Sequence, residues 1–350
     1  MPECGSQIIL CDLPIRFDTY TGCSHGCTYC FTRKKNANLS AVIPSESAGS
    51  IRRFIRGERK ETTKWCDWDI PLHWGGMSDG FQPVEKKEGR SLDALKAFAE
   101  TGYPVVISTK GALIASPDYL SVLRAANAVV QVSIASPLYD ASEPGAPAFD
   151  ERLEMLRRLS PCSKRTIARV QPYIIEAHDS ILEGLEKIRD TGCSGVVVEG
   201  LKAAKKKNGL VRIGQDYCYQ VSALRRRFSE IRDRCHELGM RFYCGENRLR
   251  SMGDHLCCCG IDGLAGFKGT EANGNHHFFS GGAKYTKRME ETGTAMVFRN
   301  AFAQKTESAR LLERLSYAKV MEKVLKTRTV HRIFGKGGST PTPALQLAVT

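Results

Sequence analysis

Residues 21–30 read TGCSHGCTYC, and this stretch places three cysteines within eight positions: Cys23, Cys27 and Cys30. Three thiols so close in sequence converge on one metal centre only if the loop is tight, and Gly22 and Gly26 allow such a turn. Thiolates at this density suit zinc or an iron–sulfur cluster. The loop therefore predicts a metal centre close to the start of the chain.

Two kinds of metal centre fit three cysteines. A structural zinc ion needs a fourth ligand nearby, and the candidates are His25, Cys11 and Cys66. His25 sits between two of the cysteines, so its side chain would have to fold back, and neither Cys11 nor Cys66 has the spacing of a zinc finger. A [4Fe–4S] cluster held by three cysteines leaves one iron open for a substrate or cosubstrate, and this is the leading interpretation.

Short apolar segments alternate with amphipathic ones from residue 69 onward. The predicted strands are Asp69–Gly75, Pro104–Thr109, Ala128–Ala135, Ile167–Ile174, Gly195–Glu199 and Arg241–Gly245. The predicted helices are Ser91–Glu100, Asp118–Ala125, Phe149–Leu159, Ser180–Asp190 and Tyr217–Leu238. This alternation indicates a parallel sheet covered by helices. With a further strand near Ile15–Tyr20, we expect the α/β class, a partial (β/α)6-type barrel with its chemistry at the C-terminal strand ends.

The charge of the chain is positive and unevenly distributed. Its 350 residues include 51 Lys+Arg and 38 Asp+Glu, a formal charge of +13. Residues 1–150 carry 16 basic and 17 acidic side chains, a net 16 − 17 = −1, whereas residues 151–350 carry 35 and 21, a net 35 − 21 = +14. A basic half indicates a polyanionic partner, so we expect nucleic acid to bind through the C-terminal half.

Cysteine usage and hydropathy predict the compartment. Fourteen cysteines without a signal-peptide pattern indicate reducing surroundings, where clustered thiols hold metal more often than they form disulfides. No apolar run approaches the roughly 18 residues that a membrane span needs. We therefore expect a cytoplasmic protein without a membrane partner.

The Cys-x3-Cys-x2-Cys loop followed by a parallel α/β array resembles the radical S-adenosylmethionine (SAM) enzymes. The segments GGMSDGFQPVEKKEGRSLDALKAF, VVISTKG and EPGAPAFDERLEMLRRL are similar to the spore photoproduct lyase-like group, often labelled DNA repair photolyases, and the resemblance spans residues 12–200. In that family the open iron of a [4Fe–4S] cluster binds SAM, and one electron cleaves it to methionine and a 5′-deoxyadenosyl radical. The resemblance implies both cofactors, and an electron donor such as flavodoxin or ferredoxin.

The resemblance also assigns residues to the SAM site. Tyr29, directly before the last cluster cysteine, would lie near the adenine, and the strand end Gly75-Gly76-Met77 would contact the amino group of SAM. Three residues fall where family members hold other polar groups of SAM: Ser78, Lys110 and Ser133. Each lies at the C-terminal end of a predicted strand, where a zwitterion and a ribose need donors and a cation.

Two departures from spore photoproduct lyases concern the return of a hydrogen atom to the substrate. The family uses a cysteine in the segment that matches Gly75–Asp79, where this chain has Gly76 and no thiol, and a tyrosine directly after the third cluster cysteine, where it has Phe31. Cys66, a weak catalytic candidate, would replace the missing thiol only if its loop folds back. We therefore expect the radical to serve a reaction other than lesion repair.

A second group of cysteines lies in FYCGENRLRSMGDHLCCCGIDGLAGFKG: Cys244, Cys257, Cys258 and Cys259. Residues 246–300 show little periodicity, and irregular loops of this kind need an organiser that a metal can supply. We expect an auxiliary iron–sulfur or zinc site with Cys244 as fourth ligand; reduced structural or redox thiols are the alternative. The predicted regions are a core over 1–245, a Cys-rich, loop-rich extension with a terminal helix over 246–330, and a flexible tail over 331–350.

Basic clusters supply the candidate phosphate contacts: Arg33–Lys35, Lys205–Lys207, Arg225–Arg227, Arg248 and Arg250. Lys205–Lys207 follow a predicted strand end at the expected rim of the active site, which favours them over arginines that fan around a helix. The leading hypothesis is a radical SAM enzyme that abstracts hydrogen from a nucleic acid, with modification of a DNA base as the expected reaction. The alternatives are a peptide or small-molecule substrate with an auxiliary cluster, and a non-catalytic, zinc-stabilised nucleic-acid-binding protein.

Overall fold

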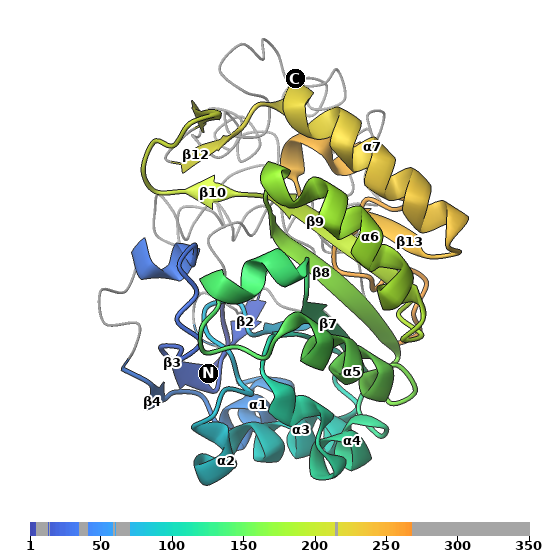
Figure 1. The fold of residues 1–350 in the computed structure, drawn as a ribbon. Helices are drawn as coiled ribbons and strands as arrows, with labels where there is room; N and C mark the ends of the chain where they lie inside the picture. Colours follow the sequence, from blue (N-terminus) through green and yellow to red (C-terminus); the bar gives the residue numbers. More distant parts are fainter. Residues whose placement is uncertain are drawn as a thin grey trace, which may run out of the picture.

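The computed structural model describes residues 1–4, 13, 15–34, 41–58, 60, 71–213 and 216–267. At its centre lies an eight-stranded sheet in the order β1-β2-β5-β6-β7-β8-β9-β13 (Figure 1). Its strands are β1 Glu3–Cys4, β2 Ile15–Phe17, β5 Leu72–Trp74, β6 Val105–Thr109, β7 Ala128–Ser133, β8 Arg165–Tyr173, β9 Gly195–Gly200 and β13 Arg241–Cys244. Strand β1 pairs antiparallel with β2, and every other pair is parallel. The predicted α/β class with a parallel sheet is confirmed.

Helices cover one face of this sheet (Figure 1). The α-helices are α1 Ala48–Ile55, α2 Glu85–Glu88, α3 Arg90–Thr101, α4 Pro117–Leu123, α5 Phe149–Leu159, α6 His178–Arg189 and α7 Val221–Glu237. Helix α5 has the predicted bounds, and α3 ends at Gly102, whose φ of 65° favours glycine. No helix within these described ranges is long and apolar enough to cross a membrane.

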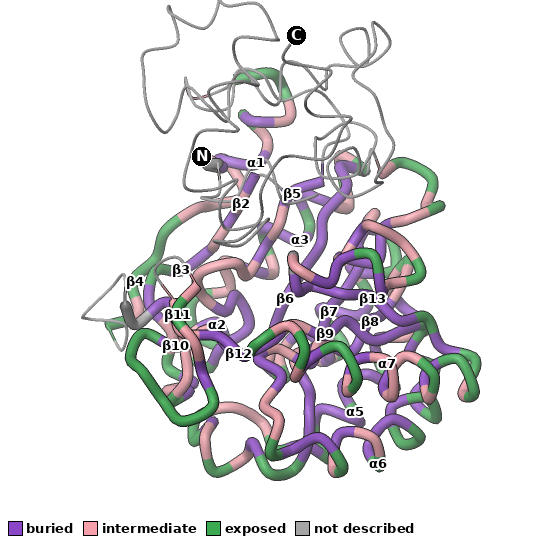
Figure 2. The backbone as a smooth tube through the Cα atoms, turned by 90° about the horizontal axis from the view of Figure 1, so that it is seen from above, coloured by how far each residue is buried: buried purple, intermediate pink, exposed green. Residues whose placement is uncertain are grey.

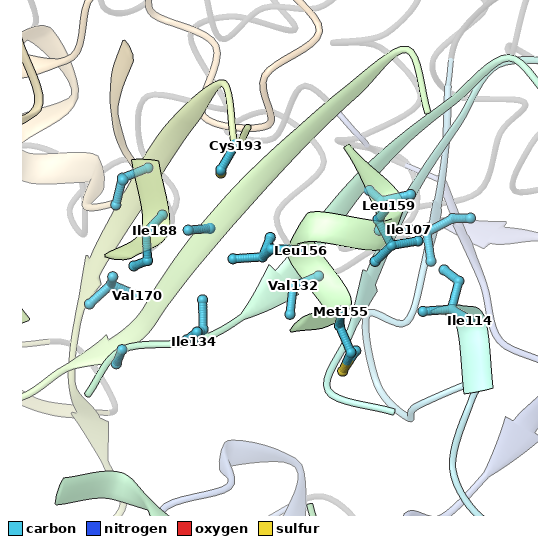
Figure 3. Close-up of a cluster of buried hydrophobic side chains, with 14 of the residues drawn as sticks. Ile107, Ile114, Val132, Ile134, Met155, Leu156, Leu159, Val170, Ile188 and Cys193 are labelled. Atoms are coloured by element: carbon cyan, nitrogen blue, oxygen red, sulfur yellow. The ribbon is translucent and has the colours of Figure 1, made fainter. Parts of the chain in front are cut away.

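The main core lies between the sheet and its helices, and Figure 2 shows the central strands buried within the molecule. Ile107 of β6 and Val132 of β7 are fully buried, as are Leu156 and Leu159 of α5. Figure 3 shows the α5 side chains lying over these strands. Burial of each such aliphatic side chain contributes about 1.5–3 kcal/mol, so this layer holds the strand ends in fixed positions.

The inner face of the sheet carries a second, smaller core. Its strand residues are Val106, Val129, Ile167, Val197 and Tyr243, which point away from the helices because side chains alternate along a strand. The segment after β13 covers them with Cys257, Cys259 and Ile261. Arg165, the first residue of β8, donates to the carbonyls of Gly260 at 2.7 Å and Asp262 at 3.1 Å. This segment thus crosses the N-terminal end of the strands and leaves their C-terminal end for chemistry.

The predicted helix Tyr217–Leu238 is wrong at its start. Residues Asp216–Tyr219 form β12, the middle strand of a small sheet with β10 (Lys202–Ala203) and β11 (Leu210–Ile213). Pairing with both neighbours and burial of the β12 side chains outweigh helical periodicity here. The helix begins at Val221 instead.

The extension after β13 is irregular where it is described, as expected. It contains one short 3-10 helix, η6 Asn247–Met252, and then loops as far as Phe267. The predicted terminal helix and tail fall within residues 268–350, outside the described residues. The boundaries at residues 245 and 330 stay predictions.

Candidate active site

The cysteine loop lies at the C-terminal edge of the sheet, where β2 ends and β3 (Tyr20–Thr21) leads into it. Cys27 is buried, Cys23 and Cys30 are half-buried, and all three are free thiols. Burial, the Asp79 carboxylate and the two other thiols together raise the pKa of Cys23 to about 12. A thiol with a raised pKa loses its proton readily only when a metal cation takes the place of the proton. Cys23, Cys27 and Cys30 together offer the three-thiolate donor set of an iron–sulfur cluster.

Backbone conformation and two side chains fix the shape of the loop. Gly22 and Gly26 have positive φ values of 85° and 67°, which favour glycine. The carbonyl of Gly22 accepts a hydrogen bond from Ser78 Oγ and another from Gln82 Nε2 at 3.2 Å. Ser78, predicted to contact SAM, thus donates its proton to the backbone of the cysteine loop. That it also contacts SAM stays a prediction.

His25 lies inside the loop with 2% of its surface exposed. Its Nδ1 is 2.8 Å from the carbonyl oxygen of Gly145, and its Nε2 is 3.2 Å from Asp79 Oδ2. Burial disfavours the charged ring, but the Asp79 carboxylate outweighs it and raises the pKa of His25. Both ring nitrogens therefore serve the scaffold, which argues against His25 as a fourth zinc ligand. Cys11 and Cys66 lie outside the described residues.

Asp79 joins the cysteine loop to the end of β6. Its carboxylate accepts hydrogen bonds from Thr109 Oγ1 at 2.7 Å and from the N–H groups of Lys110 at 2.7 Å and Gly111 at 3.3 Å. Burial opposes its charge, yet His25 and these hydrogen bonds hold the pKa of Asp79 well below its usual range. Sequence reasoning missed Asp79 as a functional residue, although an acidic residue soon after a predicted strand end was a usable signal.

Lys110 enters the site from the end of β6, with 14% of its side chain exposed. Its Nζ lies 3.8 Å from Glu143 Oε1 and 5.7 Å from the centre of the Tyr29 ring. Glu143 also pairs with Arg152, whose Nη1 donates to the carbonyl of Ser133 at 2.9 Å. Burial lowers the pKa of Lys110. The structure thus links Tyr29, Lys110 and Ser133 at this edge through a cation–π contact and through the Glu143–Arg152 ion pair, which sequence reasoning missed. That these residues contact SAM stays a prediction.

The glycine turn after β5 packs closely against its neighbours. Gly75 has a φ of 91°, and a β-carbon there would lie 2.0 Å from the carbonyl oxygen of Ser108. A β-carbon on Gly76 would lie 3.0 Å from Arg16 Cδ. The N–H of Gly75 donates to Asp18 Oδ1 at 3.1 Å. The predicted SAM contacts at Gly75, Gly76 and Met77 therefore share one strand edge with the cysteine loop.

Comparison with known protein families assigns the chain. The model of the Radical SAM superfamily matches residues 18–201, which is 184 of the 350 residues. The chain belongs to the radical SAM superfamily. Membership implies a [4Fe–4S] cluster and SAM, and confirms the predicted family.

Solved structures share the fold of this radical SAM protein. Spore photoproduct lyase complexed with dinucleoside spore photoproduct matches with a TM-score of 0.54 at 15% identity, over 66% of this chain and 77% of that one. A mutant of the lyase with bound AdoMet and dinucleoside spore photoproduct gives a TM-score of 0.54 at 14% identity, over 66% and 76%. At these identities the likeness concerns the fold.

Two curated relatives are bacterial proteins. They are Uncharacterized protein Rv2578c of Mycobacterium tuberculosis and Uncharacterized protein Mb2609c of Mycobacterium bovis, each 27% identical over 210 residues. The matched region is 54% of this chain, and the chain spans 59% of the length of either relative.

The three loop sulfurs of this radical SAM protein are not gathered as closely as the ligands of a single zinc ion. Two sulfurs bound to one zinc ion lie at most about 4.6 Å apart, twice the Zn–S distance. Among the described residues, only His255, Cys257 and Asp262 form a set of at least three donors whose atoms all lie within 4.8 Å. Cys23, Cys27 and Cys30 are not such a set. A larger centre can bridge their wider spacing.

The second cysteine group of the radical SAM protein lies on the inner face of the sheet. Cys257 and Cys259 belong to the inner core, with their sulfurs 3.1 Å apart, and Cys258 packs against it. Cys244, the expected fourth ligand, is buried in the main core instead. The structure thus brings two of the four thiols into contact, and the auxiliary metal site stays a prediction.

Two neighbours of this group were not singled out from the sequence: His255 and Asp262. The Asp262 carboxylate pairs with Arg165 at 3.1 Å and with Arg241. The N–H of Cys257 donates to His255 Nδ1 at 3.0 Å. These contacts join the segment to the N-terminal ends of β8 and β13. Asp262 lies 97 residues from Arg165 and 21 from Arg241, so no local pattern could predict these ion pairs.

Proposed function

We propose that this protein is a radical SAM enzyme that abstracts a hydrogen atom from a nucleic-acid base, in a modification other than spore photoproduct repair. One observation carries the proposal: three free thiols lie at the C-terminal edge of the sheet beside the ammonium group of Lys110. When bound by Cys23, Cys27 and Cys30, a [4Fe–4S] cluster supplies the electron that cleaves SAM to methionine and a 5′-deoxyadenosyl radical.

The chain's own residues bind and orient SAM in this proposal. Lys110, held between Glu143 and Tyr29, offers a cation to the carboxylate of SAM. The Tyr29 ring offers a flat face to the adenine, and Gly75 lets the turn after β5 pack against the Ser108 carbonyl, which holds the backbone of Gly75-Gly76-Met77 at this edge. Asp79 keeps the cysteine loop in place against β6, so that the reacting groups meet in one geometry.

Two positions argue against the return of a hydrogen atom to the substrate as spore photoproduct lyases carry it out. Gly76 has no thiol, and a β-carbon there would lie 3.0 Å from Arg16 Cδ and 3.4 Å from His73 Nδ1. An arginine side chain therefore lies against the position where the lyases have a cysteine. Phe31 has no O–H group and is 44% exposed. Both features favour a reaction in which the enzyme returns no hydrogen atom to the base through a thiol.

Exposed lysines at the rim support a polyanionic substrate. Lys205–Lys207 lie in the exposed loop between β10 and β11 (Figure 2). Such lysines neutralise phosphates without reading sequence. Arg248 is less available, because its Nε donates to Glu246 at 2.8 Å, and Arg250 is 3% exposed. Of these basic residues, Lys205–Lys207 are the best candidates for phosphate contacts.

Anaerobic reconstitution with iron and sulfide, followed by dithionite and SAM, tests the proposed chemistry. We expect 5′-deoxyadenosine in the wild type, a higher yield when DNA is added, and none in Cys30→Ala. Absence of 5′-deoxyadenosine under all conditions would contradict the proposal. A yield raised by peptides but not by DNA or RNA would instead assign the substrate to the rival class.

Salt-dependent binding to duplex DNA tests the nucleic-acid part separately. Replacing Lys205–Lys207 by alanine should make the dependence of log K on log salt less steep by about 0.9 for each phosphate that the variant no longer neutralises. The matched control is Lys86→Ala with Lys87→Ala, because these two lysines are exposed on α2. Equal slopes in both variants would remove Lys205–Lys207 from the interface.

A further inference from the structure

A polar layer crosses the inner face of the sheet just below the SAM edge. Its members come from five neighbouring strands: Arg16, His73, Ser108, Gln131 and Arg169. His73 Nε2 lies 2.9 Å from Ser108 Oγ, which donates to Gln131 Oε1 at 3.0 Å. Arg169 Nη1 donates to Ser108 Oγ at 3.2 Å and to Gln131 Oε1 at 2.5 Å. Four of the five side chains thus form one hydrogen-bonded network.

The layer lies between the SAM edge and the inner core. Arg16 and His73 are register partners, each one residue before the end of its strand. Gly76 packs directly on the Arg16 side chain. On the opposite side, Gln131 Nε2 donates to the carbonyl of Cys259 at 3.1 Å. A ligand bound to this layer would therefore lie next to the SAM site, above the buried cysteines.

The two arginines of the layer have no ionised partner among the described residues. Arg16 makes no hydrogen bond or ion pair within the described ranges, and its Nε is buried. In the same ranges, Arg169 donates only to the uncharged Ser108 and Gln131. Both side chains are half-buried, and a guanidinium that is partly withdrawn from water gains from a bound anion. Two such groups in one layer, without an ionised partner among the described residues, indicate an anion site.

Two nearby titratable groups do not supply that negative charge. Burial, together with Arg169 and Arg16, lowers the pKa of His73 to about 3, which leaves the ring neutral. Asp18 lies within electrostatic reach of Arg16, but burial raises its pKa to about 8, and its Oδ1 accepts from the N–H of Gly75. At neutral pH the described residues of the layer and these two neighbours thus carry an excess of positive charge.

We propose that Arg16 and Arg169 bind a phosphate group of the substrate inside the barrel, directly below the Gly75-Gly76 turn. The inference rests on the proposed function and gives its substrate a chemical class, a nucleotide. Guanidinium groups match phosphate oxygens with paired donors. A phosphate monoester carries a charge of about −1.5 to −2 at pH 7 and a phosphodiester about −1, and either offers several oxygens that two guanidinium groups can share.

The carboxylate of SAM is the rival anion for this layer. Lys110 offers that carboxylate a cation on the side of the cluster, within electrostatic reach of Cys27. The two arginines would then be surplus to SAM binding. Phosphate affinity and SAM affinity therefore have to be measured on the same variants, since the two ligands predict opposite results.

The reconstituted protein with SAM bound allows a direct measurement of melting temperature. Inorganic phosphate at about ten times its dissociation constant should raise Tm by about 2–4 °C relative to chloride at equal ionic strength. We expect this shift in the wild type and in the control Arg124→Gln, an exposed arginine, and no shift in Arg16→Gln or Arg169→Gln. Arg16→Lys and Arg169→Lys should retain part of it, which separates loss of charge from misfolding.

Calorimetric titration distinguishes the sources of the phosphate. Thymidine 5′-monophosphate should bind at least about tenfold more tightly than thymidine to the wild type, and equally weakly in the glutamine variants. The dinucleotide d(TpT) provides a phosphodiester, and preference for it over the monophosphate would place the group within a strand. SAM affinity should change less than about twofold in every variant.

Three results would overturn the inference: no phosphate-specific shift in the wild type, a shift that persists in both glutamine variants, or a tenfold loss of SAM affinity in those variants. The third would assign the arginines to SAM. A failure of the proposed function would be seen in a different measurement. The wild type would then form no 5′-deoxyadenosine, whether or not phosphate raises its Tm.

Discussion

The two cysteine groups of this protein are both clustered in sequence, but they differ in their position on the sheet and in the charges around them. Cys23, Cys27 and Cys30 lie at the edge where parallel sheets place their chemistry, beside the charged side chains of Lys110 and Asp79. Cys257 and Cys259 lie at the other end of the inner face, with 0% and 3% of their surfaces exposed and their sulfurs 3.1 Å apart. Cysteine density alone therefore does not reveal what a group of thiols does.

Ionisation separates the two groups further. The pKa of Cys23 is raised to about 12, because burial, Asp79 and the other thiols all disfavour its charge. Burial also opposes the charge of Cys257, but hydrogen bonds from the Cys259 thiol, from His255 and from backbone N–H groups hold its pKa well below the usual range. Cys23 therefore needs an external cation to ionise, whereas Cys257 is stabilised as a thiolate by donors of the protein itself.

The largest expected effect comes from removing one thiol of the first group. Cys23→Ala, Cys27→Ala or Cys30→Ala should abolish formation of 5′-deoxyadenosine and most bound iron, because three thiolates are the minimum donor set of the cluster. Iron analysis after anaerobic reconstitution and chromatography of the nucleoside measure both. Cys162→Ala is a control, since that buried thiol lies away from both groups, in the main core.

The triple variant of Cys23, Cys27 and Cys30 to alanine also decides the auxiliary-site prediction. The predicted auxiliary site requires this variant to keep iron or zinc, whereas the position of Cys244 in the main core and the pairing of Asp262 with two arginines favour its loss; metal-free protein would contradict the auxiliary site. One equivalent of metal or more in that variant would confirm the auxiliary site and show that the two groups have the same role.

Asp79→Asn should have the next largest effect, a loss of stability, because Asp79 holds the loop that carries the first cysteine group. It removes the charged partner of His25 and of several donors, and breaking a buried pair of this kind costs about 3–5 kcal/mol. Urea unfolding of the metal-free protein measures the destabilisation. Asp233→Asn, at an exposed position on α7, should change stability by less than about 0.5 kcal/mol. A small effect of Asp79→Asn would mean that other contacts hold the loop.

Local patterns predicted most of the fold. The bounds of α5 agree at both ends, and β6 and β7 lie within their predicted segments, because helical periodicity and β-branched runs are local signals. Strand β12 was missed because its identity depends on pairing with β10 and β11. The secondary-structure propensity of a few residues carries no information about strands that pair with them from elsewhere in the chain.

The residues of the candidate site likewise fall into those that local sequence signals predict and those that depend on distant contacts. Spacing pointed to the three cluster cysteines, and the family resemblance pointed to Lys110, whose place at a predicted strand end agreed with it. The roles of Asp79 and Arg16 depend on contacts to segments 30 or more residues away, such as the Asp79 hydrogen bond to Thr109 and the packing of Arg16 against Gly76. Only the folded chain brings these partners together, so a single sequence carries no direct sign of them.

Lys110→Met tests whether the first group has a dedicated cation for SAM. The variant keeps the length of the side chain and removes the ammonium group beside Glu143. We expect SAM affinity to fall about tenfold, or 1.4 kcal/mol, because the variant cannot form a charge-assisted hydrogen bond to the SAM carboxylate. Equilibrium dialysis with the reconstituted protein measures it. If the affinity is unchanged, another cation must bind the carboxylate of SAM. Arg169, in the polar layer below, is then the alternative.

The smallest effect is expected from Cys257→Ser, which tests the second group directly. The variant should cost about 1–2 kcal/mol of stability and leave iron content and 5′-deoxyadenosine formation as in the wild type. A thiol whose folded pKa lies below its unfolded value of about 9 contributes stability that is present above that value and lost as pH falls through the folded pKa. The stability gap to the wild type should therefore widen as pH rises towards 9. A constant gap would mean that Cys257 is a neutral thiol, and loss of 5′-deoxyadenosine would mean that the two groups are coupled.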